Sequence, residues 1–508
     1  MLWRPDFFNA GMLRAQCDSG VKAKCRADEF GFWGALALMV YDEMNISFLN
    51  HLKTMREVMM KVCLLAALMA GLTSTPLLAQ PPQDILIKNG YVMPLKPSSA
   101  DRPESDILIH QNRIAEIGKD LPTAGRRVID ARGKYVLPGF VDTHSHLWVT
   151  TMRGQFRNQD GKFFPVSNQL GARMQPADTY TAMYTGAVEL LSGGITSSGD
   201  FFDNIKGPQW GDAGLKALKD SGIRAVMYYG GPDKTTKKPI DTGHLLNLAQ
   251  QQKPDDRVTL GLGWRLPRQL NDEKNWAMRD SEFNAARQHD LPIQVHVSGD
   301  AEAMFNALID RHYLNPSVTV VHATDATPSQ LAALEKAGGS LALSPISEQR
   351  VGYGLTRIDH FSAITRKGLG IDGNALAGSG DMFATLRLAA LTESGATKDE
   401  TRPDPRKLLE MATWHGADTL GLSAKTGSLE QGKRADIQII DPDALNMSGF
   451  GGGDPAALIV YSARPENVKT VLVDGQIVKQ DGVMQQKDIE GLIGQANDSA
   501  KGLLSRSE

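Results

Sequence analysis

The chain has 508 residues, of which 22% are charged and 41% hydrophobic, and its formal net charge is −3 at pH 7. This composition and the mean hydropathy of −0.27 are typical of a globular protein large enough for one big domain plus a smaller appended unit. The near-balanced charge gives no broad basic face, so we expect no nucleic-acid partner.

The first 79 residues predict a leader followed by an export signal. From Met60 the sequence has a charged start, a short apolar run and a small residue at Ala79, which predicts a signal peptide over residues 60–79. The apolar run falls short of the roughly 20 residues that span a membrane, so we expect cleavage near Gln80 and no stable membrane anchor. The alternative is an uncleaved amphipathic anchor. Residues 1–59 show no clear periodicity. We interpret them as a non-structural leader that results from a gene start assigned too far upstream.

All three cysteines, Cys17, Cys25 and Cys63, precede the expected cleavage point. The mature protein, secreted or periplasmic, would therefore contain no disulfide, thiolate nucleophile or thiolate metal ligand. Histidine and carboxylate side chains are then the strong metal ligands that remain.

Short segments rich in β-branched residues and separated by turn residues begin and end the mature chain. They predict strands over these residues: 84–91, 106–117, 127–136, 427–440 and 468–483. The last of them contains a hairpin turn at 473–476. Neither group can bury a core alone, so we expect residues 80–136 and 427–486 to form one small composite β-sandwich. Residues 487–508 follow as a C-terminal tail.

Between these ends, apolar strand-like runs alternate with helical patterns such as 177–192 and 328–337, which predicts βα units and a parallel sheet. The strand-like runs are 139–143, 195–199, 223–229, 258–264, 292–297, 318–322, 340–343 and 368–371. Their number is the one that closes a barrel. The predicted fold class is therefore α/β, with a (β/α)8 TIM barrel over residues 137–426.

Two histidines separated by one residue, His144 and His146, lie at the carboxyl end of the first predicted barrel strand. Side chains at i and i+2 of a strand face the same side, so both imidazoles can reach one ion. A lone His-x-His is weak evidence, but three later strands end in suitable residues, His296, His322 and Asp372. All five side chains would lie on the barrel face where such enzymes keep their active sites.

Three motifs carry a family resemblance: LPGFVDTHSH at residues 137–146, GLGIDG at 368–373 and TGSLEQGKRADI at 426–437. Together they resemble the amidohydrolase superfamily, in particular its cytosine deaminase and chlorohydrolase-like branch. The resemblance covers nearly all of residues 84–486. It implies a TIM barrel with a composite β-sandwich and a divalent metal held by four positions: His144, His146, His296 and Asp372.

The predicted fourth barrel strand, residues 258–264, contains no lysine, whereas binuclear members of the superfamily often bridge two ions with a carboxylated lysine there. We therefore expect one metal ion, zinc in preference to iron or manganese, all of which suit imidazole and carboxylate ligands. Zinc lowers the pKa of a bound water from about 15.7 to about 7. Asp372 would accept that water's proton, and His322 would polarise the substrate and stabilise the tetrahedral intermediate. The alternative for His322 is a buried histidine bonded to backbone.

Two positions depart from the pattern of this branch. Its deaminases usually carry a glutamate three residues after His296, where this chain has Gly299. After the seventh strand, SPISE at residues 344–348 stands where many relatives have Asn-Pro-x-Ser-Asn. We hypothesise that Glu348 supplies the acid/base function lost at Gly299. The alternative is a solvated loop glutamate, since charged loop residues are common.

The expected activity is hydrolysis of a non-peptide C–N bond in a small molecule: an amide, a cyclic amide or an amino-substituted heterocycle. Gly299 argues against ring deamination of the ordinary cytosine or adenosine kind. Arg153, just beyond the metal pair, would orient an anionic or carbonyl group of the substrate or hold the barrel rim. Two alternatives stay open, a metal-binding protein that lost turnover and a hydrolase of C–Cl or other C–X bonds. A homo-oligomer is compatible with the sequence.

Overall fold

The computed structural model describes residue 55 and residues 59–60, 83–157, 161–232, 237–486 and 488–506. Contacts divide the chain into two units, Met1–Pro81 and Pro82–Glu508, and nearly all of the described residues belong to the second. The predicted leader and signal peptide lie almost entirely outside the described residues. Within the described parts of the chain, no helix has the length and apolar character needed to cross a membrane.

Eight parallel strands form the central sheet: β6 (Phe140–Ser145), β7 (Ile195–Phe202), β8 (Arg224–Tyr229), β9 (Val258–Trp264), β10 (Ile293–Val297), β11 (Val318–His322), β12 (Ser340–Leu343) and β13 (Lys367–Leu369). Strands that follow one another in the chain are neighbours in the sheet. Its two edges approach each other, because the Asp372 amide donates to the His144 carbonyl at 2.8 Å and the Ile371 amide donates to the Asp142 carboxylate at 2.9 Å. The predicted TIM barrel is confirmed, as a nearly closed barrel.

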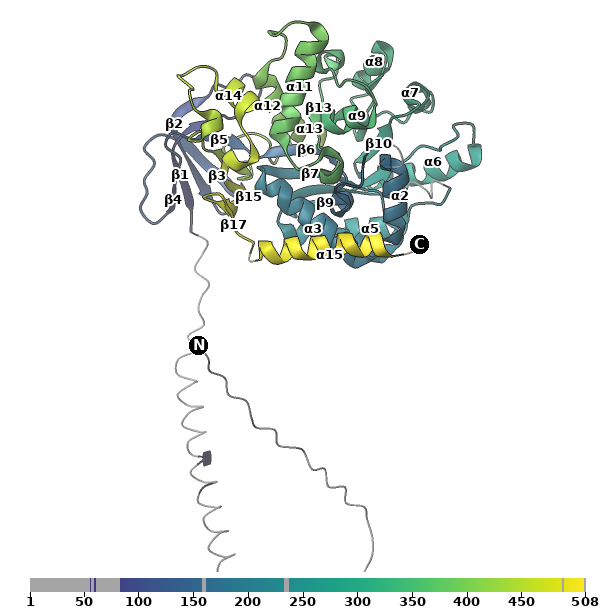
Figure 1. Ribbon diagram of the computed structural model, residues 1–508, viewed down its shortest axis with the longest axis horizontal. Coiled ribbons are helices and arrows are strands. Elements are labelled where there is room, and N and C mark those ends of the chain that lie inside the picture. The colour runs from purple at the N-terminus through teal and green to yellow at the C-terminus, as the bar shows by residue number, and fades with distance from the viewer. Residues whose placement is uncertain are drawn as a thin grey trace, which may run out of the picture. The chain divides into compact units, whose positions relative to one another are not determined.

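Helices follow the strands and surround this barrel (Figure 1). They are α2 (Phe163–Arg173), α3 (Pro176–Ser192), α4 (Pro208–Ser221), α5 (Thr242–Gln250), α6 (Glu273–Gln288), α7 (Ala301–Asp310), α8 (Pro328–Lys336), α9 (Pro345–Val351), α10 (Asn374–Ala377), α11 (Met382–Thr397), α12 (Pro405–Met411), α13 (Trp414–Thr419), α14 (Pro455–Ser462) and α15 (Ile489–Ser505). The 3-10 helices are η1 (Leu147–Met152), η4 (Ile358–Phe361), η5 (Leu445–Met447) and η6 (Pro465–Asn467). The two helices predicted over 177–192 and 328–337 are α3 and α8, each displaced by one residue at one end.

The start of α8 shows how local sequence sets a helix boundary. Thr327 and Gln330 form a reciprocal capping box, in which each side chain bonds the other residue's backbone N–H. Pro328 occupies the first helical position, where its missing N–H costs nothing. The helix therefore begins where the polar pattern predicts it.

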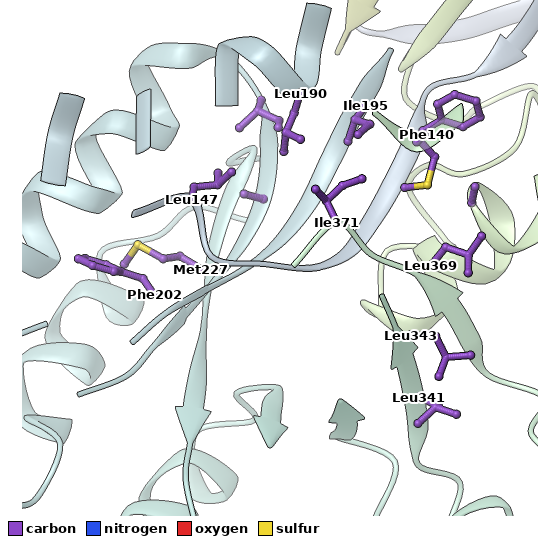
Figure 2. Close-up of a cluster of buried hydrophobic side chains, with 14 of the residues drawn as sticks. Phe140, Leu147, Leu190, Ile195, Phe202, Met227, Leu341, Leu343, Leu369 and Ile371 are labelled. Atoms are coloured by element: carbon purple, nitrogen blue, oxygen red, sulfur yellow. The ribbon is translucent and has the colours of Figure 1, made fainter. Parts of the chain in front are cut away.

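The barrel core lies between the strands and the helices that cover them. Figure 2 shows Ile195 of β7, Met227 of β8 and Leu341 of β12 among its side chains, together with Leu190 of α3. Every residue of β8 is buried, as expected for parallel strands that are covered on both faces. Runs without a polar face, such as β8 and β9, therefore mark several of the barrel strands in the sequence.

Nine strands from both ends of the chain form a second, mixed sheet beside the barrel (Figure 1). They are β1 (Ile85–Val92), β2 (Arg102–His110), β3 (Arg113–Gly118), β4 (Arg127–Asp130), β5 (Tyr135–Pro138), β14 (Ile437–Ile440), β15 (Val468–Val473), β16 (Gln476–Gln480) and β17 (Val483–Met484). The two ends join where β5 pairs antiparallel with β14. The sheet also curls, because Ile114 of β3 donates its amide to the Lys433 carbonyl at 2.9 Å. One apolar cluster contains side chains from both ends, Val136 and Ile437 among them. The predicted composite of the two chain ends is confirmed.

Three of the predicted strands had wrong boundaries because turns without proline interrupt them. The strand predicted over 106–117 is two strands, β2 and β3, since Gln111 adopts a φ of 54° and reverses the chain. The strand predicted over 127–136 is likewise β4 and β5, separated by a turn at Gly133. Of residues 427–440, only the last four form a strand. The predicted hairpin turn at 473–476 is confirmed between β15 and β16.

The C-terminal segment forms the helix α15, which the sequence analysis did not predict. It packs mainly against α3, along which it runs in Figure 1. The Arg506 guanidinium donates to both carboxylate oxygens of Asp178, at 2.6 and 2.9 Å. Asp178 also belongs to the capping box that starts α3. The segment is therefore attached to the barrel by a charge-assisted contact.

Candidate metal centre

Four side chains from three places in the sequence converge at the carboxyl ends of the barrel strands. His144 and His146 come from the end of β6, His296 from β10, and Asp372 follows β13. Their ligand atoms all lie within 4.8 Å of one another. The Nε2 atoms of His146 and His296 are 3.2 Å apart, and Asp372 Oδ1 lies 3.2 Å from His144 Nε2. The structure thus brings together the four residues that the sequence predicts as ligands.

Unusual backbone conformations place the last of these ligands. Asp372 has a φ of 58° and Gly373 a φ of 99°, so the chain turns sharply as it leaves β13. Gly370 lets the two strand ends meet, because a Cβ there would lie 2.8 Å from the His144 carbonyl oxygen. A left-handed conformation at a residue with a side chain costs free energy and is concentrated at functional sites. Closure of the barrel and formation of the ligand set therefore depend on the same residues.

Hydrogen bonds at the Nδ1 atoms of two of the histidines fix the orientation and the tautomer of their rings. His144 Nδ1 lies 2.9 Å from Gln294 Oε1, and His146 Nδ1 lies 2.8 Å from the Phe201 carbonyl oxygen. The Gln294 amide nitrogen donates to the Thr143 carbonyl at 2.8 Å, so its oxygen is the atom that faces His144. Both acceptors are oxygens, so each Nδ1 donates and each Nε2 keeps its lone pair for the centre.

The donor set fits a divalent ion. His144 Nε2 is buried and makes no well-directed hydrogen bond within the described residues. Two imidazole Nε2 atoms face each other at 3.2 Å, a separation that a shared cation would make favourable. Three imidazoles and one carboxylate are ligands that zinc takes in proteins. The residues present are therefore chemically suited to hold the metal that the sequence predicts.

Replacing Gln294 by leucine is expected to weaken metal binding by about 10–100-fold, the usual effect of losing a partner that orients a ligating histidine. His144 would keep its position in β6 but would lose the acceptor that orients its ring. Competition with a chromophoric chelator measures the affinity. Gln252→Leu is the matched control, because the Gln252 amide donates to the Val258 carbonyl, away from the site. Equal affinities for the two variants would contradict this role of Gln294.

His322 lies at the end of β11 beside the ligand set. Its Nε2 is 3.9 Å from Asp372 Oδ2, and its Nδ1 is 3.0 Å from Glu348 Oε1. Burial acts to lower the pKa of His322, but the hydrogen bond to Glu348 and the charges of Asp372 and Glu348 outweigh it and raise that pKa above its ordinary value. The alternative of a histidine bonded to backbone is therefore wrong, since its partner is a carboxylate.

Two further buried carboxylates, Asp203 and Asp200, lie close to the candidate metal ligands. Asp203 Oδ1 lies 3.1 Å from His146 Nδ1 and accepts a hydrogen bond from the Trp148 indole at 2.6 Å, and its carboxylate also pairs with Arg265. Burial raises the pKa of Asp203, but His146 and Arg265 outweigh it, so that pKa lies well below its ordinary range. Asp200 accepts from the Leu147 amide at 2.9 Å, and burial raises its pKa to about 7.

A cavity of about 740 Å³ opens beside His296. Its lining combines apolar and polar side chains: Phe164, Leu266, Met304, Tyr353, Asn168 and Arg265. Gly299 also lines it, and a Cβ at that position would meet nothing within 4 Å. The cavity is therefore open at the place where deaminases of the resembled branch carry a glutamate.

Arg153 is not among the described residues that line this cavity. Its guanidinium pairs with Glu189 of α3 and donates to the Gly378 carbonyl at 2.6 Å. These contacts tie the segment after β13 to α3 at the barrel rim. A role of Arg153 in substrate binding stays a prediction.

Sequence reasoning missed Gln294 and Arg265. A signal for Gln294 was present, because it is a polar residue two places before His296 in an otherwise apolar strand and so shares its face. Arg265 follows the fourth barrel strand, and nothing local distinguishes it from a solvated loop arginine. Its contact with Asp203 appears only when β7 and β9 are brought together.

Comparison with known proteins identifies the family. Residues 135–478 match the amidohydrolase family. The chain is 28% identical over 448 residues to a 5'-deoxyadenosine deaminase of Methanosarcina mazei, with 83% of this chain and 99% of the relative covered. Among solved structures, an adenosine deaminase from Xanthomonas campestris with bound zinc aligns with a TM-score of 0.73 at 21% identity, over 84% of this chain and 99% of that chain.

A triazine hydrolase from Arthrobacter aurescens aligns with a TM-score of 0.73 at 25% identity, covering 82% of this chain and 99% of that chain. The family match spans more than half of the 508 residues and includes the barrel strands that carry the ligand set. The chain therefore belongs to the amidohydrolase family and is a metal-dependent hydrolase of carbon–nitrogen bonds other than peptide bonds.

Proposed function

We propose that this enzyme hydrolyses the exocyclic C–N bond of an amino-substituted heterocycle, with the aminopurine nucleosides as the first class to test, and that its metal is zinc. The observation that carries the proposal is the convergence of three histidines and Asp372 beside a 740 Å³ cavity. The 28% identity to a 5'-deoxyadenosine deaminase over nearly the whole length of that relative supports this substrate class. The zinc bound by the Xanthomonas campestris deaminase supports the choice of metal.

A divalent ion in this ligand set would lower the pKa of a bound water to about 7 and so supply hydroxide near neutral pH. Burial alone would raise the pKa of Asp372, but His144, whose Nε2 lies 3.2 Å from Oδ1, and the charges of His322 and His146 hold that pKa well below its ordinary value. Asp372 is thus ionised and can accept the proton of the attacking water. The raised pKa of His322 favours the form protonated on both ring nitrogens. Its Nε2, 3.9 Å from Asp372 Oδ2, can then donate a hydrogen bond to the atom that gains negative charge.

The proton transfers of this reaction do not require a glutamate at position 299. Water adds its hydroxyl to the carbon that bears the amino group, the electron pair of the ring C=N bond moves to the ring nitrogen, and the proton of the water passes to Asp372. Asp372 then delivers this proton to the amino nitrogen. As the electron pair on the ring nitrogen restores the C=N bond, the exocyclic C–N bond breaks, ammonia leaves and the hydroxy form of the product remains. Since Gly299 cannot protonate a ring nitrogen, we expect electron-poor rings, which accept a nucleophile without prior protonation, to react faster than adenosine.

A substrate screen tests this proposal. Zinc-loaded protein is assayed for ammonia release from 5'-deoxyadenosine, adenosine and an aminotriazine, with a cyclic amide and a chlorotriazine for comparison. We expect zinc-dependent ammonia release that is fastest with the aminotriazine. Chloride release in place of ammonia would favour C–Cl hydrolysis. Metal binding without turnover of any compound would contradict the proposed activity.

We also propose that the enzyme acts outside the cytoplasm, as a secreted or periplasmic protein. The charged start and apolar run of residues 60–79 support this location. Small heterocycles would then be met in the periplasm or the medium.

A further inference from the structure

Glu348 is a buried carboxylate whose contacts lie on the side of His322 that faces away from the metal ligands. Its side chain is fully buried in α9. Oε1 accepts from the Ser344 amide at 2.8 Å and lies 3.0 Å from His322 Nδ1, while Oε2 accepts from the Thr356 hydroxyl. Both oxygens therefore have partners inside the protein. The alternative of a solvated loop glutamate is wrong.

The same contacts limit what Glu348 can do directly. Both carboxylate oxygens are occupied by the Ser344 amide, the Thr356 hydroxyl and His322 Nδ1, and His322 lies between the carboxylate and Asp372. A substrate bound beside the metal ligands would meet the imidazole, not the carboxylate. A direct proton transfer from Glu348 to substrate would require the carboxylate to leave three buried hydrogen bonds, each of which is costly to leave unmade.

We propose that Glu348 is a positioning residue, which acts on the reaction only through His322 by holding its ring with Nδ1 as the donor and Nε2 toward Asp372. The inference rests on the proposed function for the reaction that is measured. It assigns Glu348 a role different from the direct acid/base role that the sequence suggested.

A carboxylate is suited to this task for a chemical reason. An ionised carboxylate only accepts hydrogen bonds, so the imidazole nitrogen beside it must donate. The asparagine found at this place in the resembled motif carries both a donor and an acceptor and can pair with either tautomer of a histidine. It is also one methylene shorter. Glu348 therefore fixes the state of His322 in a way that the usual residue does not.

His322 needs such support because its backbone is strained. It has a φ of 70°, and Ala323 after it has a φ of 51°. Conformations of this kind persist only where the surroundings determine them. The Glu348 carbonyl accepts the Tyr353 amide at 2.8 Å, and the Thr324 hydroxyl donates to the Tyr353 carbonyl at 2.7 Å. The end of β11, the helix α9 and the loop after it are thus tied together around the His322 ring.

A double-mutant cycle tests whether Glu348 acts through His322. With the substrate that the screen identifies, Glu348→Gln is expected to lower kcat by about 10–100-fold, as loss of an orienting partner does, with KM and metal content little changed. His322→Ala should lower kcat further, and the double variant should be no slower than His322→Ala alone. Losses that multiply in the double variant would show independent action on the substrate and would overturn the proposal.

Two variants make the result interpretable. Glu348→Asn introduces the residue that many relatives carry, and it should lose at least as much kcat as Glu348→Gln because its side chain is one methylene shorter and its amide can pair with either tautomer of His322. Glu302→Gln is the matched control, since Glu302 is an exposed carboxylate on α7. Its kcat is expected to equal that of the wild type. An equal loss in Glu302→Gln would show that the effect is not specific to position 348.

A measurement without substrate separates this inference from the proposed function. In zinc-loaded protein labelled with ¹⁵N-histidine, the Nδ1 proton signal of His322 is assigned by its loss in His322→Ala. We expect the signal to be lost or shifted in Glu348→Gln and unchanged in Glu302→Gln. An unaltered signal in Glu348→Gln would contradict the positioning role, whereas failure of every substrate would contradict only the proposed activity.

Discussion

Replacing Asp372 by asparagine is expected to abolish most of the activity, with a loss of kcat/KM on the order of 10²–10⁴-fold from the missing proton acceptor alone. Asparagine keeps the volume of the side chain and the backbone bond from the Asp372 amide to the His144 carbonyl, so the barrel edge stays closed. It removes the ionised carboxylate that lies 3.2 Å from His144 Nε2. Metal binding and proton transfer are therefore affected by one change.

Two measurements separate these effects. Elemental analysis of the purified variant reports the metal content, and single-turnover kinetics at saturating zinc report the chemical step. We expect both to fall. Treating the wild type with a chelator should reproduce the loss and added zinc should reverse it, whereas zinc should not restore the variant. The control is Asp310→Asn, at an exposed carboxylate at the end of α7. Full activity in metal-free wild type would remove the basis of the whole mechanism.

The sequence predicted the barrel well because its strands are buried on both faces. Runs such as 258–264 read as continuous apolar segments, and the observed strand β9 has the same bounds. Helices with a capping box, such as α8, were equally readable. Prediction failed where a turn has ordinary residues, as at Gln111, whose left-handed backbone divides β2 from β3. It also failed for α15, which is fixed by Arg506 and Asp178, residues 328 positions apart.

The ligand set was readable for a different reason. His144 lies near the end of β6 and His146 directly follows that strand, and parallel barrel strands place all of their carboxyl ends on one face. The alignment of His296 with them follows from topology, whereas Asp372 also needs the left-handed backbone after β13. The role of Glu348 could not be predicted from topology. Its contact with His322 depends on how the helix α9, which follows β12, packs beside the end of β11. Local sequence marks which residues reach the site, and the tertiary contacts decide what each can do there.

A buried ion pair connects the barrel to the composite sheet. Arg224 begins β8, and Asp436 precedes β14. The guanidinium donates to the two carboxylate oxygens at 2.6 and 3.1 Å, and the exposed fractions of the two side chains are 3% and 0%. Asp474 accepts a further bond from Arg224 at 3.2 Å. The pair lies where residues from the middle of the chain meet residues from its C-terminal part, so its loss should affect the whole second unit.

Replacing Asp436 by alanine is expected to destabilise the protein by about 3–5 kcal/mol, because the buried Arg224 charge loses its bidentate partner and, among the described residues, keeps the ion pair with Asp474 alone. Chemical denaturation at pH 7 measures the free energy of unfolding. Asp498→Ala is the matched control, since Asp498 and its partner Lys501 are 80% and 79% exposed and such surface pairs contribute little. Equal midpoints for the two variants would show that the buried pair does not hold the two parts together.

The pH dependence gives a second, independent readout of this pair. Burial acts to raise the pKa of Asp436, but Arg224 and the Asp474 amide outweigh it and hold that pKa below its ordinary value. A carboxyl whose pKa is lower in the folded than in the unfolded state stabilises the fold above its unfolded pKa of about 3.9, and this contribution is lost as the pH falls through the folded pKa. The wild type should therefore lose stability more steeply than Asp436→Asn when the pH is lowered below about 4. Acid titrations followed by circular dichroism compare the two, and parallel curves would mean that Asp436 has the same pKa in the folded and unfolded protein.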